Sequence, residues 1–172
     1  NSIALPTMHK SIFLFISLFL IHTAQAAQDP DLQQSIQISG DFLQMNVHTA
    51  SGSYQGNFVA TQGSMRLTGN KVQVNQDKNK QLVSIIASGN PVKFSKKIAT
   101  TQETIQATAS QITYQAQQNK ITLEGNATLT SNAGKQIKAG KISYDLNTGN
   151  FQAERSGTQR VHIQFQPAPA SH

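Results

Sequence analysis

The chain repeats one strand-forming pattern along most of its length. In each copy, a run with apolar residues at alternating positions is followed by a polar turn and by a second run that closes on a small residue or glycine. Three copies begin at residues 67, 105 and 137, which are 38 and 32 residues apart. Such self-similarity is typical of one supersecondary unit stacked on copies of itself around a shared apolar interior. The copies are Leu67–Val74 with Ile85–Asn90, Ile105–Tyr114 with Ile121–Asn126, and Ile137–Tyr144 with Phe151–Gly157, and an earlier one is Phe42–Val47 with Tyr54–Val59.

Apolar and polar side chains alternate almost everywhere from Ser35 onward, which places the apolar ones on one face of each strand. No stretch of the domain has a 3.6-residue period, so no helix is predicted there. Two one-sided sheets that face each other form a sandwich or jellyroll, and the regular repeat favours an elongated one over a closed barrel. The sequence therefore predicts an all-β fold, an elongated and open-ended two-sheet β-jellyroll built from repeated antiparallel strands.

Glycine and proline mark the predicted boundaries of the strands. Five of the 11 glycines precede an asparagine, and both residue types tolerate a positive φ, so turns are predicted at these pairs. Pro91 is expected to begin a strand, and Ser95–Glu103 is expected to be a loop. The five glycines are Gly56, Gly69, Gly89, Gly125 and Gly149.

The first 26 residues have the features of an upstream extension (1–7) and a secretory signal peptide (8–26). An apolar run of eleven residues, Ser11–Ile21, follows a short basic start and precedes a small-residue motif that predicts cleavage after Ala26. A membrane anchor is the alternative, but spanning a bilayer takes ~20 apolar residues. The remaining chain is predicted to hold a polar leader (27–34), the β-jellyroll domain (35–166) and a disordered tail (167–172).

The composition indicates an exported protein that is stable without disulfides. The chain contains no cysteine, so it has neither a disulfide nor a residue for lipid acylation, and a soluble periplasmic location is expected. The formal net charge of +6 does not predict nucleic-acid binding, because export and the lack of basic clusters interleaved with aromatic residues oppose it. The lysines are interpreted either as ordinary solvated or edge-protecting residues or as attraction for the phosphates of an anionic amphiphile. They are Lys71, Lys93, Lys96, Lys97, Lys135, Lys138 and Lys141.

The sequence nominates no catalytic residue, no metal ligand and no cofactor. It lacks a cysteine nucleophile, a G-x-S-x-G motif and a phosphate-binding glycine loop, and its 8 acidic residues are too scattered to nominate a carboxylate pair. Outside the signal and the tail, His48 and His162 remain, far apart in sequence and without further ligands at a metal-binding spacing. The simplest interpretation is a protein that is not an enzyme.

Several motifs occur in the order that is found in the OstA-like domain family. The chain resembles this family from about Ser35 to Phe165, and within it the soluble periplasmic proteins that bridge the two membranes in lipopolysaccharide transport. The resemblance implies a jellyroll whose groove holds the acyl chains of lipid A. The motifs are Ile36–Asp41, Gly52–Gly63, Leu67–Val72, Ile112–Tyr114, Leu123–Ala127 and Ile137–Tyr144.

The resemblance also implies partners. Copies of the chain would stack head to tail, and the end strands would join related jellyroll domains of an inner-membrane-anchored protein and an outer-membrane translocon. The edge residues expected to carry this assembly are Ser35, Gln37, Arg160, Val161, Ile163 and Phe165.

Inner-face residues are the candidates for lipid contact, although an apolar residue on an inner face is more often plain core. Two further hypotheses remain open: a ligand-free structural β-scaffold that links envelope proteins, and an exported hydrolase. The candidates for the groove lining are Ile36, Ile38, Phe94, Ile112 and Tyr114.

Overall fold

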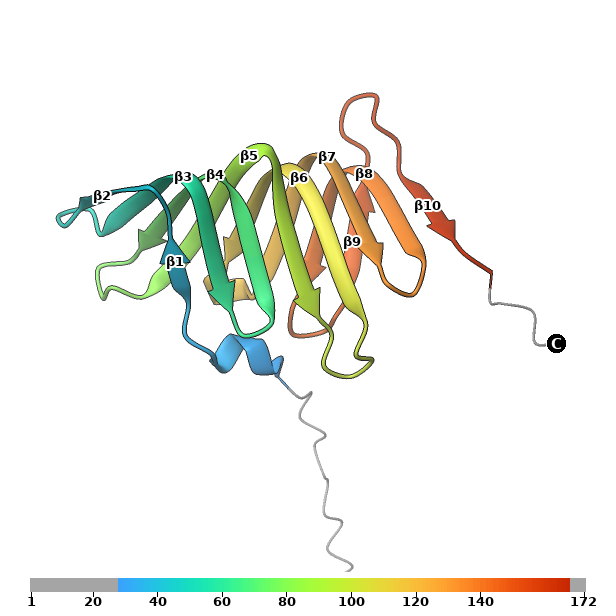
Figure 1. Cartoon of the computed structure of the whole chain (residues 1–172), viewed down its shortest axis with the longest axis horizontal. Helices are drawn as coiled ribbons and strands as arrows, with labels where there is room; N and C mark the ends of the chain where they lie inside the picture. Colours follow the sequence, from blue (N-terminus) through green and yellow to red (C-terminus); the bar gives the residue numbers. More distant parts are fainter. Residues whose placement is uncertain (1–27, 168–172) are drawn as a thin grey trace, which may run out of the picture.

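A computed structural model describes residues 28–167, which form ten antiparallel strands and two short 3₁₀ helices (Figure 1). The predicted all-β fold is confirmed, while the predicted segments 1–7 and 8–26 and most of the predicted tail lie outside the described residues. Within those residues, no helix is long and apolar enough to cross a membrane. The elements are η1 (Pro30–Gln33), β1 (Gln37–Ser39), β2 (Phe42–Asn46), β3 (Ser51–Gln62), β4 (Met65–Gln76), β5 (Leu82–Lys97), β6 (Thr104–Gln115), η2 (Ala116–Gln118), β7 (Lys120–Ser131), β8 (Lys135–Asp145), β9 (Phe151–Glu154) and β10 (His162–Phe165).

The strands are joined by hydrogen bonds into one sheet with the order β1-β3-β4-β5-β6-β7-β8-β10, in which β2 also pairs with β3 and β9 with β8. Successive strands lie side by side, so the sheet grows along one direction and does not close into a barrel (Figure 1). The repeats seen in the sequence correspond to the strand pairs β4 with β5, β6 with β7 and β8 with β9. The predicted stack of repeated antiparallel units is therefore confirmed.

A line of register shifts crosses the sheet and folds it in two. The pairing is interrupted after Gln55, Thr68, Ser88, Thr108 and Glu124, at about the middle of β3, β4, β5, β6 and β7 respectively. An irregularity of this kind bends a strand and increases its local twist. The bends lie along the upper edge in Figure 1, where every long ribbon turns over. The two predicted sheets are thus the two halves of one continuous sheet.

Each long strand contributes to both halves. The β1–β10 half-sheet consists of β1, β10 and residues 58–62, 65–69, 92–97, 104–109, 127–131 and 135–139. The β2–β9 half-sheet consists of β2, β9 and residues 51–55, 71–76, 82–88, 111–115, 120–124 and 141–145.

Turns predicted at four glycine–asparagine pairs are wrong, because these pairs bend strands and do not end them. Gly56 and Asn57 have φ values of 74° and 44° inside β3, and Gly125 with Asn126 repeats this geometry in β7. At Gly69, a Cβ atom would lie 2.9 Å from the Phe58 ring and 3.0 Å from the carbonyl oxygen of Ser88. The local chemistry that permits a turn also permits a bulge, and the pairing partner decides between them. The four pairs begin at Gly56, Gly69, Gly89 and Gly125, whereas Gly149 lies in a turn between β8 and β9 as predicted.

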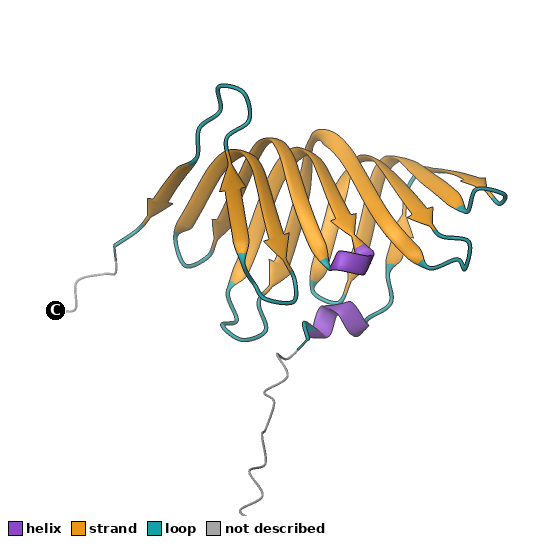
Figure 2. Ribbon diagram, turned by 180° about the vertical axis from the view of Figure 1, so that it is seen from behind, coloured by secondary structure: helices purple, strands orange, loops and turns teal. Residues whose placement is uncertain are grey.

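Three smaller predictions are also corrected. Pro91 lies in the middle of β5 and not at a strand start, at a point where the pairing skips from Ser88 to Val92, so its missing N–H interrupts no regular ladder bond. The strand β5 continues to Lys97, which shortens the predicted loop to residues 98–103. No helix was predicted, but the structure contains two short 3₁₀ helices. Both lie on the open side of the folded sheet, opposite the bend (Figure 2).

The core fills the space between the two half-sheets. Alternate residues of every long strand are buried there, as the period of two predicted, and their neighbours face outward. The largest fully buried side chains are Phe58, Val72, Val92, Ile112, Leu123 and Ile142.

We expect Gly140→Ala to destabilise the fold at the bend. A Cβ atom on Gly140 would lie 2.5 Å from the backbone nitrogen of Ser156, in the segment that connects β9 to β10, so this segment must move. Overpacking of this kind costs ~1–3 kcal/mol in the free energy of unfolding, which urea denaturation measures. The matched control is Gly52→Ala, whose nearest neighbour would be Met45 Cγ at 3.5 Å. Equal stability of the two variants would contradict the close packing of this segment.

Candidate functional site

The interior side chains form continuous rows that cross the whole sheet, because paired residues of neighbouring strands point to the same side. One row in each half-sheet reaches both end strands. In the β1–β10 half-sheet it contains Ile38, Ala60, Leu67, Phe94, Ala107, Leu129, Ile137 and Ile163. In the β2–β9 half-sheet it contains Met45, Gly52, Val74, Ile85, Tyr114, Ile121, Tyr144 and Phe151. The interior is therefore lined by side chains that are almost all apolar from one end to the other.

An apolar cavity lies between the two half-sheets, toward their β1 end. Its volume is ≈ 50 Å³, whereas pockets that hold a small molecule measure ~300–1,000 Å³. Four of the five residues predicted to contact lipid line it, namely Ile36, Phe94, Ile112 and Tyr114. Burial raises the pKa of the Tyr114 hydroxyl, as expected for a side chain that faces an apolar interior. This cavity is too small for a bulky ligand, so its wall must move to admit one.

A larger pocket of ≈ 300 Å³ opens at the β1 and β2 end of the sheet. It contains Ile38, the fifth predicted lipid-contact residue, and it shares Ile36 and Ile85 with the smaller cavity. Leu43 and Met45 of β2 also line it, and 45% and 64% of their surfaces are exposed. This pocket is therefore an apolar mouth that leads to the cavity.

A matching pocket of ≈ 300 Å³ opens at the β9 and β10 end. Ile163 and Phe165 line it together with Phe151, and all three side chains are more than half exposed. Ile105 and Tyr144 form its inner wall. The apolar interior thus reaches the surface at both ends of the molecule.

Only some of the six residues that were predicted to carry the assembly lie within the edge strands. Gln37 lies in the edge strand β1 and Ser35 precedes it, while Ile163 and Phe165 lie in the edge strand β10. Arg160 and Val161 precede β10, and Arg160 lines an outer pocket away from the interior. The sequence did not indicate Leu43, Met45 and Phe151 as edge residues, although the period-two pattern of Phe42–Asn46 could have indicated the first two.

The two candidate histidines do not meet. His48 lies in the turn between β2 and β3, and His162 begins β10 at the opposite end of the sheet. Residues 28–167 contain no group of three histidine, cysteine or acidic side chains arranged to hold a metal ion.

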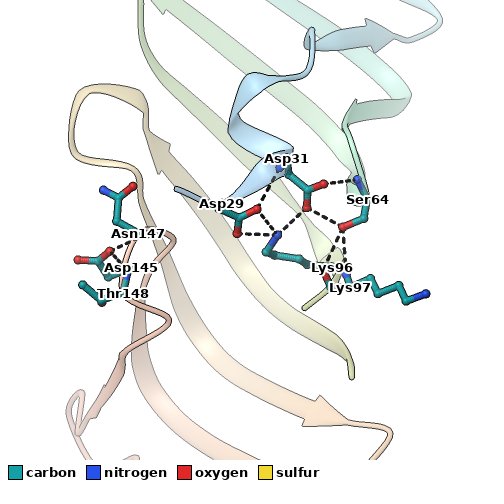
Figure 3. Close-up of polar contacts among 8 residues, drawn as sticks. All are labelled: Asp29, Asp31, Ser64, Lys96, Lys97, Asp145, Asn147 and Thr148. Carbon is teal, nitrogen blue, oxygen red and sulfur yellow. Dashed lines mark hydrogen bonds and ion pairs between the residues drawn. The ribbon is translucent and has the colours of Figure 1, made fainter. Parts of the chain in front are cut away.

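An ionic cluster connects the segment at η1 to the end of β5 on the open side of the sheet (Figure 3). The ammonium of Lys96 lies 2.8 Å from a carboxylate oxygen of Asp29 and 2.5 Å from one of Asp31, and only 2% of the lysine side chain is exposed. Asp31 also accepts hydrogen bonds from the backbone N–H and the hydroxyl of Ser64, at 2.8 and 2.6 Å. The cluster fastens the leader and η1 to the turn between β3 and β4 and to the end of β5.

These contacts stabilise the charged forms of the cluster. Burial alone would raise the pKa of Asp31, but its hydrogen bonds to Lys96 and Ser64 outweigh burial and lower it below its ordinary value. Burial alone would lower the pKa of Lys96, but its hydrogen bonds to Asp29 and Asp31 raise it. Burial raises the pKa of Tyr144 on the facing half-sheet, and the charges of Lys96 and Asp29 also act on this hydroxyl. The cluster therefore lies close to both half-sheets.

The ionic cluster corrects the interpretation of Lys96 as a solvated or edge-protecting residue within the predicted loop Ser95–Glu103. Lys96 instead shares the inner face of β5 with Val92 and Phe94, and the alternation of this strand could have indicated that position. The pairing with Asp31 could not be predicted, because 65 residues separate the two in the chain.

The fold and its interior define an open-ended β-jellyroll whose apolar interior reaches both end strands. The chain belongs to the family described as "LptA/(LptD N-terminal domain) LPS transport protein", which it matches over residues 37–150. This match confirms the resemblance inferred from the sequence motifs.

Proteins of several bacteria are similar to the chain over most of its length. LptH of Pseudomonas aeruginosa is 30% identical over 131 residues, which cover 76% of this chain and 74% of LptH. LptA of Haemophilus influenzae is 27% identical over 89% of this chain and 88% of its own length, and LptA of Escherichia coli K12 is 26% identical over 92% and 89%. All three are named lipopolysaccharide export system proteins.

A solved structure has the same fold. The crystal structure of LptH from Pseudomonas aeruginosa, described as the LptA-homologous periplasmic component of the lipopolysaccharide transport device, superimposes with a TM-score of 0.74 at 29% identity. The similarity covers 80% of this chain and 99% of that one.

We expect Lys96→Met to lower the free energy of unfolding by about 3–5 kcal/mol at neutral pH, because it leaves two carboxylates without their buried cation. The lowered pKa of Asp31 means that its contribution is present above its ordinary pKa of 3.8 and is lost as the pH falls through the folded-state value. The difference between wild type and variant should therefore shrink in acid. Lys97→Met is the control, since this side chain points away from the cluster (Figure 3). A difference that is small or independent of pH, in urea titrations at several pH values, would contradict the ionic stabilisation.

Proposed function

We propose that this protein binds the acyl chains of lipopolysaccharide in its apolar interior and carries the lipid across the periplasm from the inner to the outer membrane. Membership of the LptA/LptD family and the names of the relatives support this proposal. The observation that carries it is the apolar interior that is open at both ends. A continuous apolar path is what a lipid needs to move without entering water.

The free energy of burying acyl chains favours movement of the lipid along the apolar interior over its release into water. Each methylene group that is buried contributes ~0.8 kcal/mol, so a lipid with several acyl chains would leave a closed pocket very slowly. In a channel that continues into a neighbouring molecule, the acyl chains exchange one apolar contact for another, and the full cost of hydration is avoided. The described residues hold no nucleotide-binding loop, and we assign the energy source to a partner.

The two ends are suited to head-to-tail stacking. Each strand on the path from β1 to β10 is antiparallel to the next, and this path contains an even number of strands. A second copy in the same orientation therefore presents its β1 antiparallel to β10 of the first. Its β2 likewise lies beside β9 and runs in the opposite direction. Both half-sheets, and the channel between them, can continue from one molecule to the next by strand addition.

The end strands are equally suited to other jellyroll domains. We propose that the β1–β2 end and the β9–β10 end join related domains of an inner-membrane-anchored partner and of an outer-membrane translocon. The exposed apolar side chains at both ends support this role, because an unpaired apolar edge is an aggregation hazard unless a partner covers it.

Two other functions compete with lipid transport. A structural scaffold would have the same end strands but no ligand, and a hydrolase would need catalytic groups beside the interior. Mass spectrometry of the purified protein separates a carrier from a scaffold, since bound lipopolysaccharide is expected only for a carrier. Protein without lipid that also fails to bind added lipopolysaccharide would favour the scaffold.

Tyr114→Glu should weaken lipopolysaccharide binding at least ~10-fold, because it places an unpaired charge in the wall of the cavity. Ile38→Glu, in the mouth, should act in the same direction. Thr113→Glu is the matched control, since Thr113 neighbours Tyr114 in β6 and points to the opposite side of the sheet. Equilibrium binding measures the effect, and circular dichroism checks the fold. A folded Tyr114→Glu variant that binds like wild type would show that the lipid lies elsewhere.

The stacked arrangement predicts a specific cross-link between copies. If the interior row continues, Ile163 of one molecule lies opposite Ile38 of the next, and the outward-facing Gln164 lies opposite Gln37. The chain has no cysteine, so a Gln37→Cys, Gln164→Cys variant should form disulfide-linked ladders on oxidation, because paired Cα atoms lie within ~5.5 Å. Denaturing electrophoresis without a reducing agent shows the ladder.

The control for this cross-link is Gln37→Cys with His162→Cys, whose outward-facing side chains are two residues out of register and should cross-link poorly. Deletion of residues from Arg160 onward removes β10 and should abolish concentration-dependent assembly in sedimentation experiments. Equal cross-linking of the two cysteine pairs, or assembly of the truncated chain, would contradict the proposed junction.

A further inference from the structure

Lys96 is a cation on the inner, otherwise apolar face of β5. Residues before and after it in the chain line different apolar compartments, because Phe94 of β5 lines the cavity near β1, while Ile98, just after the end of β5, lines the pocket at the β9–β10 end. Its partner across the sheet, Ile105, lines the same end pocket. The ionic cluster of Asp29, Asp31 and Lys96 therefore lies between the two compartments, where a lipid moving along the interior would pass.

The leader that carries the two carboxylates also forms part of the cavity wall. Leu32 packs against the core, and Ile36 lines both the cavity and the mouth at the β1 end. The side chain of Gln62 donates hydrogen bonds to the carbonyl oxygens of Leu32 and Gln34, at 3.4 and 3.1 Å. Residues 29–36 thus act as a strap across the open side of the sheet, fastened by these bonds and by the ionic cluster. Movement of the strap would enlarge a cavity that is now only ≈ 50 Å³.

The two carboxylates surround the ammonium of Lys96 with anionic oxygens, much as a phosphate group would. Asp29 and Asp31 place oxygens 2.8 and 2.5 Å from one ammonium, as the oxygens of a single phosphate would do. A phosphate monoester carries a charge of about −1.5 to −2 and three strong acceptor oxygens, so it can replace both carboxylates at once. A buried ion pair gives little net stability compared with apolar packing, and a role in switching is a better reason for its position.

We propose that Lys96 is a binding residue for the phosphate group of an anionic amphiphile, and that Asp29 and Asp31 occupy this position until the lipid displaces the strap. The acyl chains enter the cavity that Ile36 uncovers, and the phosphate takes the place of the carboxylates at the open side. This inference rests on the proposed function. It adds that Lys96 binds the phosphate and that Asp29 and Asp31 compete with the lipid for it.

The test compares wild type with Asp29→Asn, Asp31→Asn and with the triple variant that also carries Lys96→Gln. The ligands are lipid A with its phosphate groups and lipid A from which they have been removed. The double variant should bind phosphorylated lipid A at least ~10-fold more tightly than wild type. The lipid phosphate then no longer competes with two carboxylates for its charge-assisted hydrogen bonds to Lys96. Addition of Lys96→Gln should remove this gain. Dephosphorylated lipid A should bind the double and the triple variant equally.

Two further experiments complete the test, one with a milder variant and one with inorganic phosphate as a competitor. Ser64→Ala removes one hydrogen bond from Asp31, and it should give a smaller gain in affinity in a protein that keeps all three charges. This variant replaces the double variant if thermal unfolding shows that the latter does not fold. Inorganic phosphate at millimolar concentration should leave lipid binding unchanged. Inhibition by it would assign Lys96 to free phosphate and overturn the assignment to the lipid.

The outcomes separate this inference from the proposed function. If the gain in affinity persists in the triple variant, or if the double variant binds phosphorylated lipid A no better than wild type, the assignment of Lys96 is wrong although the protein still binds lipid. If no variant binds either lipid, the proposed function fails together with this inference.

Discussion

The bend that crosses the sheet is the constraint on which the rest of the structure depends. A flat antiparallel sheet with one apolar face would expose that face to water, and the bulges in β3 to β7 fold it onto itself. Since every long strand crosses the bend, both walls of the interior come from the same strands. The continuous apolar interior is a direct consequence of this fold, because the rows that line it are the ordinary cross-strand rows of one sheet.

The same geometry explains why the ends remain open. Folding a sheet in two pairs its faces but leaves its first and last strands without neighbours, so apolar side chains of β2, β9 and β10 are exposed. A soluble protein tolerates such edges only when something covers them. The stacking that we propose would cover the edges and continue the apolar interior at once, so the same contacts would stabilise the protein in solution and serve its proposed role in transport.

The third side of the interior, opposite the bend, is closed by side-chain contacts and not by the sheet. The leader crosses this side and is held by one buried lysine and two aspartates. Backbone ladders can be separated only at a high cost in hydrogen bonds, whereas a strap held by a few polar side chains can be released by a ligand that offers equivalent contacts. In the mechanism that we propose, the open side is therefore the part of the wall that moves.

The sequence by itself determined the strands, their apolar faces and their repetition, because alternation and spacing are local properties of the chain. It also indicated Ile36, Ile112 and Tyr114 as inner-face residues, since parity along a strand decides which side a residue faces. Only the tertiary structure decided that Gly56 and Gly125 bend strands, because a turn and a bulge share the same left-handed backbone and differ in what pairs beyond them. It also decided that Lys96 meets Asp29 and Asp31, because that contact depends on the folding of the leader across a sheet whose strands lie far along the chain.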